Sequence, residues 1–239
     1  MEIIGYRRSV IPACDVASLP QLEMLVEATC KVSGIGGYKI GLKLGLGFGL
    51  KLVVDTIKEQ TNLPVIYDHQ KAGNDIPEMG LDFAEEAKEA GVDAVILFPF
   101  AGPKTEQAWI KACREAGLEV LVGGHMTHEK FLASEGGFID DHAPYEIYKI
   151  AAELGVKDFI VPGNKPGFVL KYREHLENIL GSRKFTLYAP GFISQGGDIS
   201  KTGQVAGENW HAIVGSAIYK VGGVEEMRQV AYQLTSQII

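Results

Sequence analysis

Short apolar runs of four or five residues recur along the whole chain at similar intervals. They are nearly continuously apolar instead of alternating with polar positions, which is typical of strands that are covered on both faces. The predicted strands are Ser9–Ala13, Tyr38–Gly41, Pro64–Asp68, Ala94–Phe98, Glu119–Gly123, Phe159–Pro162, Phe185–Ala189 and Ala212–Gly215.

The segments between these runs have the spacing of amphipathic helices. In Pro77–Ala90, the residues Met79, Phe83, Ala87 and Ala90 fall on one stripe, so we expect this stripe to face the core. The predicted helices are Leu19–Val32, Leu50–Gln60, Pro77–Ala90, Lys104–Ala116, Pro144–Leu154, Gly167–Leu180 and Val224–Ile238.

A repeat of buried strands and helices predicts parallel strands joined by right-handed crossovers. Eight such units in 239 residues have the length of a single (β/α)8 TIM barrel, which we predict as one domain over residues 1–239. An open doubly wound sheet is the alternative, but no Gly-x-Gly-x-x-Gly follows the first strand. In a barrel, the active groups are expected just after the carboxyl ends of the strands.

Composition and charge exclude several classes of protein. Hydrophobic residues make up 46% and charged residues 22% of the chain, as in an ordinary globular protein. The net charge of −7 disfavours binding to nucleic acid or to an anionic membrane. No apolar run approaches the roughly 18 residues that span a bilayer, and the first residues contain no apolar signal core. The three cysteines form no metal or redox motif, so we expect a cytoplasmic protein with reduced thiols.

Charged side chains of both signs follow the first three predicted strands. Asp15 follows the first strand, Lys39 lies in the second, and Asp68, Lys71 and Asp75 follow the third. If the barrel closes, these groups converge, and each holds its neighbour ionised. The alternative is a structural ion-pair network at the mouth of the barrel.

A glycine-rich segment follows the seventh strand and ends in Gln195-Gly196-Gly197-Asp198. Glycines let backbone N–H groups approach a ligand closely, and barrels often bind phosphate with the loops after strands seven and eight. Because a pair of glycines also occurs in plain turns, the position after strand seven is what favours a phosphate site.

Motifs at the ends of six strands give the chain a resemblance to the orotidine 5′-phosphate decarboxylase family, within a superfamily of small phosphate-binding barrels. The resemblance covers nearly the whole chain, and the turn after strand seven is its most specific part. The matching segments are Ile11-Pro-Ala-Cys-Asp15, Tyr38-Lys-Ile-Gly41, Asp68-His-Gln-Lys-Ala-Gly-Asn-Asp-Ile-Pro77, Met126-Thr-His128, Pro190-Gly191 with Gln195-Gly-Gly-Asp198, and Ile213-Val-Gly-Ser-Ala-Ile-Tyr219.

This resemblance implies decarboxylation of orotidine 5′-phosphate to UMP, without a metal or organic cofactor, by a homodimer with shared sites. It implies a charged row of Lys39, Asp68, Lys71 and Asp75, in which Lys71 donates the proton to the pyrimidine carbon. Asp75 and Ile76 would reach the neighbouring subunit's site. The implied substrate contacts are Asp15 to ribose, Thr127 to the pyrimidine ring, and Gln195, Gly196, Gly197, Gly215 and Ser216 to phosphate.

The chain departs from the family pattern at two places. Lys71 comes three residues after Asp68, whereas the family spacing is two, so a bulge or an early strand end must re-aim it. Gly73 could permit this, and otherwise His69 or Gln70 takes the expected place. Ser216 stands where the family usually has a phosphate-binding arginine, for which Lys201 or Lys220 could compensate.

Three other functions stay open from the sequence. A 3-hexulose-6-phosphate synthase or keto-gulonate phosphate decarboxylase would need a divalent metal, and those enzymes usually have Glu where this chain has Lys39. A phosphate-ligand binder without activity would fit the two departures. A metal hydrolase would use His125 and His128, but their spacing is not that of a helical metal motif. We expect these histidines, His175 and His211 to be solvated, and Trp109 and Trp210 to pack in the core.

Overall fold

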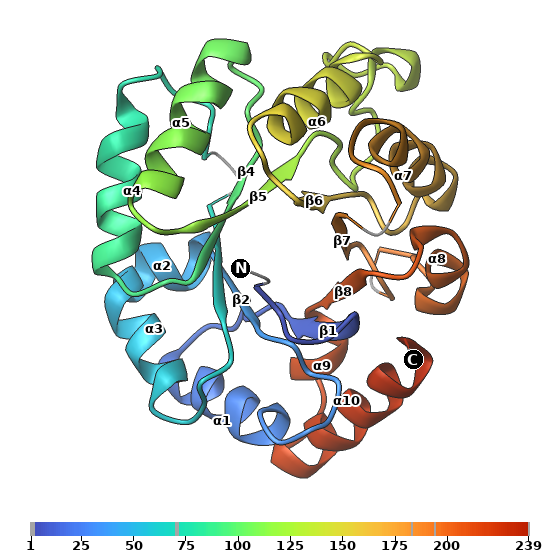
Figure 1. Ribbon diagram of the computed structural model, residues 1–239. Coiled ribbons are helices and arrows are strands. Elements are labelled where there is room, and N and C mark those ends of the chain that lie inside the picture. The colour runs from blue at the N-terminus through green and yellow to red at the C-terminus, as the bar shows by residue number, and fades with distance from the viewer. Residues whose placement is uncertain (1–2, 70–71, 183, 194, 239) are drawn as a thin grey trace.

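The computed structural model describes residues 3–69, 72–182, 184–193 and 195–238. Within them, eight parallel strands form one sheet in the order β1-β8-β7-β6-β5-β4-β3-β2, and helices surround it (Figure 1). The strands are β1 (Arg8–Pro12), β2 (Tyr38–Gly41), β3 (Val65–Asp68), β4 (Ala94–Leu97), β5 (Glu119–Gly123), β6 (Asp158–Ile160), β7 (Thr186–Pro190) and β8 (Trp210–Val214).

The two ends of this sheet meet along β1 and the segment that leads into β2. Isolated parallel bridges join Val10 to Ile35 and Ala13 to Lys39. The backbone N–H of Cys14 donates to the carbonyl of Lys39 at 2.8 Å. The sheet is therefore nearly closed into a barrel, which confirms the predicted fold class.

Side chains along each strand alternate between the barrel interior and the surrounding helices. Ile66 packs inside the barrel with Ile96, Leu121 and Ile213, whereas their strand neighbours join the larger core between sheet and helices. Both faces are apolar, which explains the uninterrupted apolar runs in the sequence. All eight strands lie within two residues of their predicted limits.

Seven helices correspond to predicted ones and cover the outside of the sheet. They are α1 (Leu19–Thr29), α3 (Leu50–Lys58), α4 (Met79–Glu89), α5 (Pro103–Glu115), α6 (Ala143–Glu153), α7 (Pro166–Leu180) and α10 (Val224–Ile238). Four short elements were not predicted, namely α2 (Leu42–Phe48), η1 (Ala133–Glu135), α8 (Ile199–Ala206) and α9 (Ser216–Tyr219).

The predicted buried stripe of α4 is partly wrong. Met79 is exposed and Phe83 is half-buried, while Gly80, Ala84 and Ala87 are buried. A Cβ on Gly80 would lie 2.9 Å from the ring of Trp109, so α4 packs closely against α5 through its smallest residue. Close approach of two helices thus decides this face instead of side-chain hydropathy.

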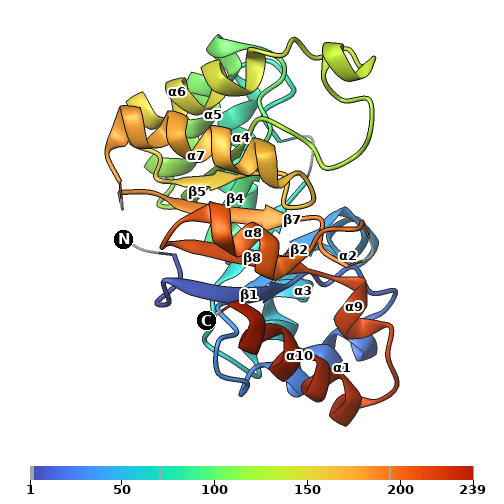
Figure 2. The same cartoon turned by 90° about the vertical axis from the view of Figure 1, so that its right-hand side faces the viewer.

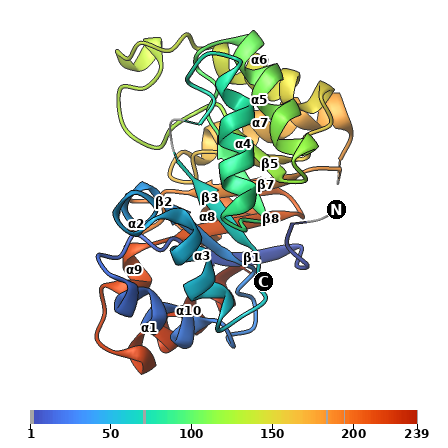
Figure 3. The same cartoon turned by 90° about the vertical axis from the view of Figure 1, so that its left-hand side faces the viewer.

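The loops that carry candidate chemistry lie at one end of the barrel. In Figures 2 and 3, α2, α9 and the long loop between β5 and α6 lie on the same side, opposite the N-terminus. Within the described ranges, no helix is long and apolar enough to cross a membrane. All three cysteines are unpaired.

Candidate active site

A pocket of about 810 Å³ opens at the carboxyl ends of the strands. Apolar side chains of the barrel interior, such as Ile96 and Ile213, form part of its wall. Residues from every side of the barrel therefore share one cavity. Among the residues predicted from the sequence, the following line it: Asp15, Lys39, Asp68, Thr127, Gln195, Gly215 and Ser216.

Lys39 is held between two carboxylates in this pocket. Its Nζ lies 3.1 Å from Oδ2 of Asp68 and 3.8 Å from Oδ1 of Asp15. The side chains of Lys39 and Asp68 are 11% and 7% exposed. Burial by itself would lower the pKa of Lys39, but the charges of Asp68 and Asp15 outweigh it and raise the pKa above its ordinary value. Lys39 is thus a permanently charged ammonium at the pocket wall.

The chain leaves β3 early, directly after Asp68. The strand ends at Asp68 itself, and Gly73 has a φ of 88°, a left-handed conformation typical of a turn. The ring of His69 turns toward Tyr67, with 2.5 Å between its Nδ1 and the Tyr67 hydroxyl, and it does not line the pocket. Gln70 and Lys71 lie outside the described residues.

Asp75 and Ile76 are exposed and are not among the described residues that line the pocket. The hydroxyl of Thr105 donates to the Asp75 carbonyl at 2.9 Å, and the indole N–H of Trp109 donates to the Ile76 carbonyl at 3.1 Å. Both donors belong to α5, so this helix holds the two residues on the outer surface.

The glycine-rich turn after β7 uses its own N–H groups. The N–H of Gly196 donates to the carbonyl of Ile193 at 3.0 Å, and that of Gly197 donates to the carbonyl of Gly191 at 3.1 Å. Ile193 has a φ of 62°, which is strained for a β-branched residue. The two glycines therefore shape the turn, and Gln195 lines the pocket together with Gly191 and Phe192.

The pocket also contains residues that the sequence analysis missed. Lys43 lines it, whereas Lys201 and Lys220 do not. Lys43 lies on α2, a helix that its glycines, Gly45 and Gly47, concealed from the pattern. Tyr219 and His125 are further lining residues, together with Leu42 and Leu46.

The expectation of solvated histidines is wrong for His125 and His211. His125 is 1% exposed and His211 is 2% exposed. His211 lies 2.7 Å from the hydroxyl of Ser9, and burial lowers its pKa to about 3. Trp109 and Trp210 are buried, as predicted. In the part of the chain that the structure describes, no three His, Cys, Asp or Glu side chains are grouped so that they could hold a metal ion.

Comparison with known proteins gives consistent matches over nearly the whole chain. The family model described as "Orotidine 5'-phosphate decarboxylase / HUMPS family" matches residues 8–230. An orotidine 5′-phosphate decarboxylase of Methanosarcina barkeri is 31% identical over 232 residues, which cover 96% of this chain and 94% of the relative. The Methanosarcina mazei enzyme of the same name is 33% identical over 208 residues, which cover 85% of this chain and 84% of the relative.

Solved structures agree with the fold. The crystal structure of orotidine 5′-monophosphate decarboxylase from Methanocaldococcus jannaschii in complex with the inhibitor BMP has a TM-score of 0.82 and 23% identity, covering 98% of this chain and 99% of that one. The enzyme from Pyrococcus horikoshii has a TM-score of 0.77 and 24% identity, covering 96% of this chain and 99% of its own.

Proposed function

Because the chain belongs to the orotidine 5′-phosphate decarboxylase / HUMPS family, we propose that it converts orotidine 5′-phosphate to UMP and CO₂. The observation that carries this proposal is the ammonium of Lys39, buried in the pocket between Asp68 and Asp15. The curated relatives bear the name of this decarboxylase, which favours it over a hexulose-phosphate synthase.

The reaction explains why a charged row is useful. The bond between C6 of the pyrimidine and the carboxyl group breaks, its electron pair stays on C6, and CO₂ leaves. No easy resonance sink exists for this carbanion, so a nearby ammonium stabilises it as the charge develops. An ammonium then protonates C6 and gives UMP.

We assign that proton to Lys71, as the family resemblance implies. In this proposal Lys39 and Asp68 are the inner part of the row, and Asp15 binds the ribose hydroxyls. Two observations support the assignment. Asp68 points into the pocket beside Lys39, and β3 ends at Asp68, which frees the next residues from the strand geometry that would direct Lys71 the wrong way.

We further propose that Lys43 supplies positive charge to the substrate phosphate. Lys39 has two carboxylate neighbours, whereas Lys43 has no acidic partner within the described part of the chain. Gln195, Gly215 and Ser216 line the same cavity and would donate hydrogen bonds. A charged donor is worth more than the single neutral bond of Ser216, so Lys43 would replace the family's arginine.

We propose a homodimer in which Asp75 and Ile76 face the neighbouring subunit's site. Large apolar side chains are exposed on α2, α3, α4 and the loop before α4, on the side of the barrel that faces the viewer in Figure 3. Exposed apolar side chains on several neighbouring elements favour a protein interface. These residues are Leu42, Leu46, Phe48, Leu52, Ile76, Met79 and Leu81. With its unpaired thiols, we place the enzyme in the cytoplasm.

The test is the ultraviolet loss of orotidine 5′-phosphate with purified protein. We expect turnover that EDTA leaves unchanged, and complete loss of turnover in Lys71→Ala with normal folding by circular dichroism. Turnover that depends on a divalent metal would favour the sugar-phosphate enzymes. UMP binding without turnover would favour the inactive binder, and near-normal turnover of Lys71→Ala would refute the assigned proton donor.

A further inference from the structure

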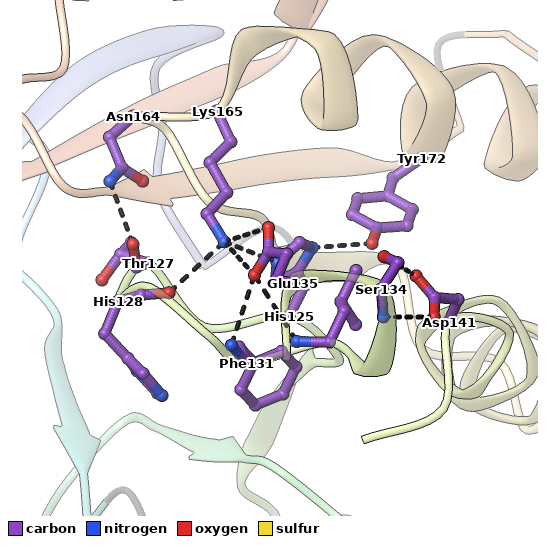
Figure 4. A network of polar contacts seen from close by, with 11 residues as sticks. His125, Thr127, His128, Phe131, Ser134, Glu135, Asp141, Asn164, Lys165 and Tyr172 are labelled. Carbon is purple, nitrogen blue, oxygen red and sulfur yellow. Dashed lines mark hydrogen bonds and ion pairs between the residues drawn. The ribbon is translucent and has the colours of Figure 1, made fainter. Parts of the chain in front are cut away.

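A second lysine, half-buried, lies at the mouth of the barrel, on the side opposite Lys39 in the strand order. Lys165 precedes α7, and its side chain is 17% exposed. Its Nζ lies 3.0 Å and 3.1 Å from the two carboxylate oxygens of Glu135, 3.0 Å from Nε2 of His125 and 3.3 Å from the carbonyl oxygen of His128 (Figure 4). An ammonium can donate three hydrogen bonds, and His125, His128 and Glu135 together accept all three.

The partners of Lys165 belong to the end of β5 and to the long loop that follows. Glu135 lies in η1 and also accepts the N–H of Phe131 at 3.2 Å. His125 accepts a hydrogen bond from Lys165 at Nε2, so its Nδ1 carries the ring proton and donates to the hydroxyl of Tyr172 at 2.8 Å. Lys165 therefore ties the loop between β5 and α6 to the start of α7.

The residue before Lys165 holds the preceding peptide group of the same loop. Nδ2 of Asn164 donates to the carbonyl of Thr127 at 3.0 Å. The carbonyls of Thr127 and His128 are thus each held by one of two consecutive residues, Asn164 and Lys165, as Figure 4 shows. A Cβ on Gly191 would lie 3.0 Å from Cγ2 of Thr127 and 3.2 Å from Oδ1 of Asn164, so the turn after β7 packs against this peptide.

We infer that Asn164 and Lys165 are positioning residues, which fix the successive carbonyls of Thr127 and His128 so that Thr127 stands at the pocket wall beside the turn after β7. This inference rests on the proposed function, since it concerns how Thr127 meets the pyrimidine of orotidine 5′-phosphate. Neither Asn164 nor Lys165 is among the described residues that line the pocket, so both act through the backbone carbonyls that they hold. Hydrogen bonds from an ammonium in a mostly buried place are strong enough to fix a loop.

The experiment is a double-mutant cycle of Lys165→Met and Thr127→Ala, with orotidine 5′-phosphate turnover as the measurement. We expect Lys165→Met to lower kcat/KM by about 10-fold to 100-fold, the loss of one or two charge-assisted bonds. In the Thr127→Ala background the same change should lower kcat/KM less than about threefold, because the residue that it positions is gone. Losses that multiply in the double variant would overturn the inference.

A matched control comes from α7 itself. Arg173 is also a half-buried cation, which pairs with Glu177 at 3.4 Å and donates to the carbonyl of Val205 at 2.9 Å. Because Arg173 does not line the pocket or contact the β5 loop, Arg173→Met should lower the melting temperature but leave kcat/KM unchanged. An equal loss of kcat/KM in both variants would reduce Lys165 to a structural role.

A second measurement does not depend on turnover. Hydrogen–deuterium exchange of the peptide over residues 125–131 should become faster in Lys165→Met and stay unchanged in Arg173→Met. If the unmodified protein does not turn over orotidine 5′-phosphate, the proposed function is refuted. Faster exchange in Lys165→Met would then still support the positioning role. Unchanged exchange together with full turnover would refute the positioning role alone.

Discussion

Two lysines at the mouth of this barrel, Lys39 buried and Lys165 half-buried, each pair with a carboxylate, and we propose different roles for them. Lys39 lies 3.1 Å from Asp68, and Lys165 lies 3.0 Å from Glu135. Lys39 lines the pocket, while the ammonium of Lys165 is directed to a histidine ring, a backbone carbonyl and a loop carboxylate. An ion pair at the mouth of the barrel is therefore no sign of chemistry by itself, and we expect the direction of the ammonium to decide its role.

The two regions also differ in the groups that surround the lysine ammonium. Lys39 has two carboxylates, which raise its pKa despite burial. Lys165 has one carboxylate and the neutral ring of His125, whose pKa burial and the charge of Lys165 lower to about 4. Alkaline pH thus weakens the first region, and acid pH weakens the second.

Of the changes within these two regions, removal of Lys39 should have the largest effect. Lys39→Met leaves Asp68 buried beside the substrate without its cation, so we expect kcat/KM to fall by about 1,000-fold and the free energy of unfolding to fall by about 3 kcal/mol. Lys51→Met is the control, because Lys51 and Asp55 form an exposed pair with 70% and 50% side-chain exposure. Turnover of Lys39→Met within threefold of the unmodified protein would contradict the assigned role.

The pH dependence of that stability has a definite sign. Since the folded-state pKa of Lys39 is raised above its ordinary value of 10.5, its contribution is fully present below pH 10.5 and is lost as the pH rises through the folded pKa. The stability gap between the unmodified protein and Lys39→Met should therefore shrink only above pH 10.5 in urea unfolding.

The second region should lose stability in acid. The pKa of His125 falls from 6.5 to about 4 on folding, so its contribution is present above pH 6.5 and is lost as the pH falls through 4. At 1.36 kcal/mol per pH unit the loss is on the order of 3 kcal/mol. We measure the free energy of unfolding in urea at pH 7 and at pH 4.5. Between these two pH values, His125→Gln should lose clearly less of this free energy than the unmodified protein. His211 contributes to both proteins alike, and equal losses in the two would contradict the neutral, buried state of His125.

The smallest effects should concern the phosphate. We expect Lys43→Ala to weaken UMP binding by about 10-fold and to leave uridine binding unchanged, since only UMP carries the phosphate. Ser216→Arg should tighten UMP binding by a similar factor, because it restores a charged donor. Titration calorimetry with both ligands measures this. Equal weakening for UMP and uridine would place Lys43 elsewhere than at the phosphate, and weaker UMP binding in Ser216→Arg would mean that the phosphate lies away from Ser216.

Local properties of the sequence determined the barrel and the first part of the site. Apolar runs located all eight strands, since a strand that is buried on both faces is apolar at nearly every position. The rule that active groups follow the strands then selected Asp15, Lys39 and Asp68, which share the pocket. Helix α2 was missed, because Gly45 and Gly47 lower its intrinsic helix propensity while tertiary contacts still form it.

Only the tertiary structure decided the direction of side chains that belong to loops. Lys165 contacts His125 across 40 residues and Glu135 across 30, and periodicity contains no information on such pairs. The N–H groups of Gly196 and Gly197 likewise close their own turn, which the presence of two glycines did not reveal. Hydrophobic patterning is a property of neighbours along the chain, whereas the partner of a buried charge is chosen by the packing of distant segments.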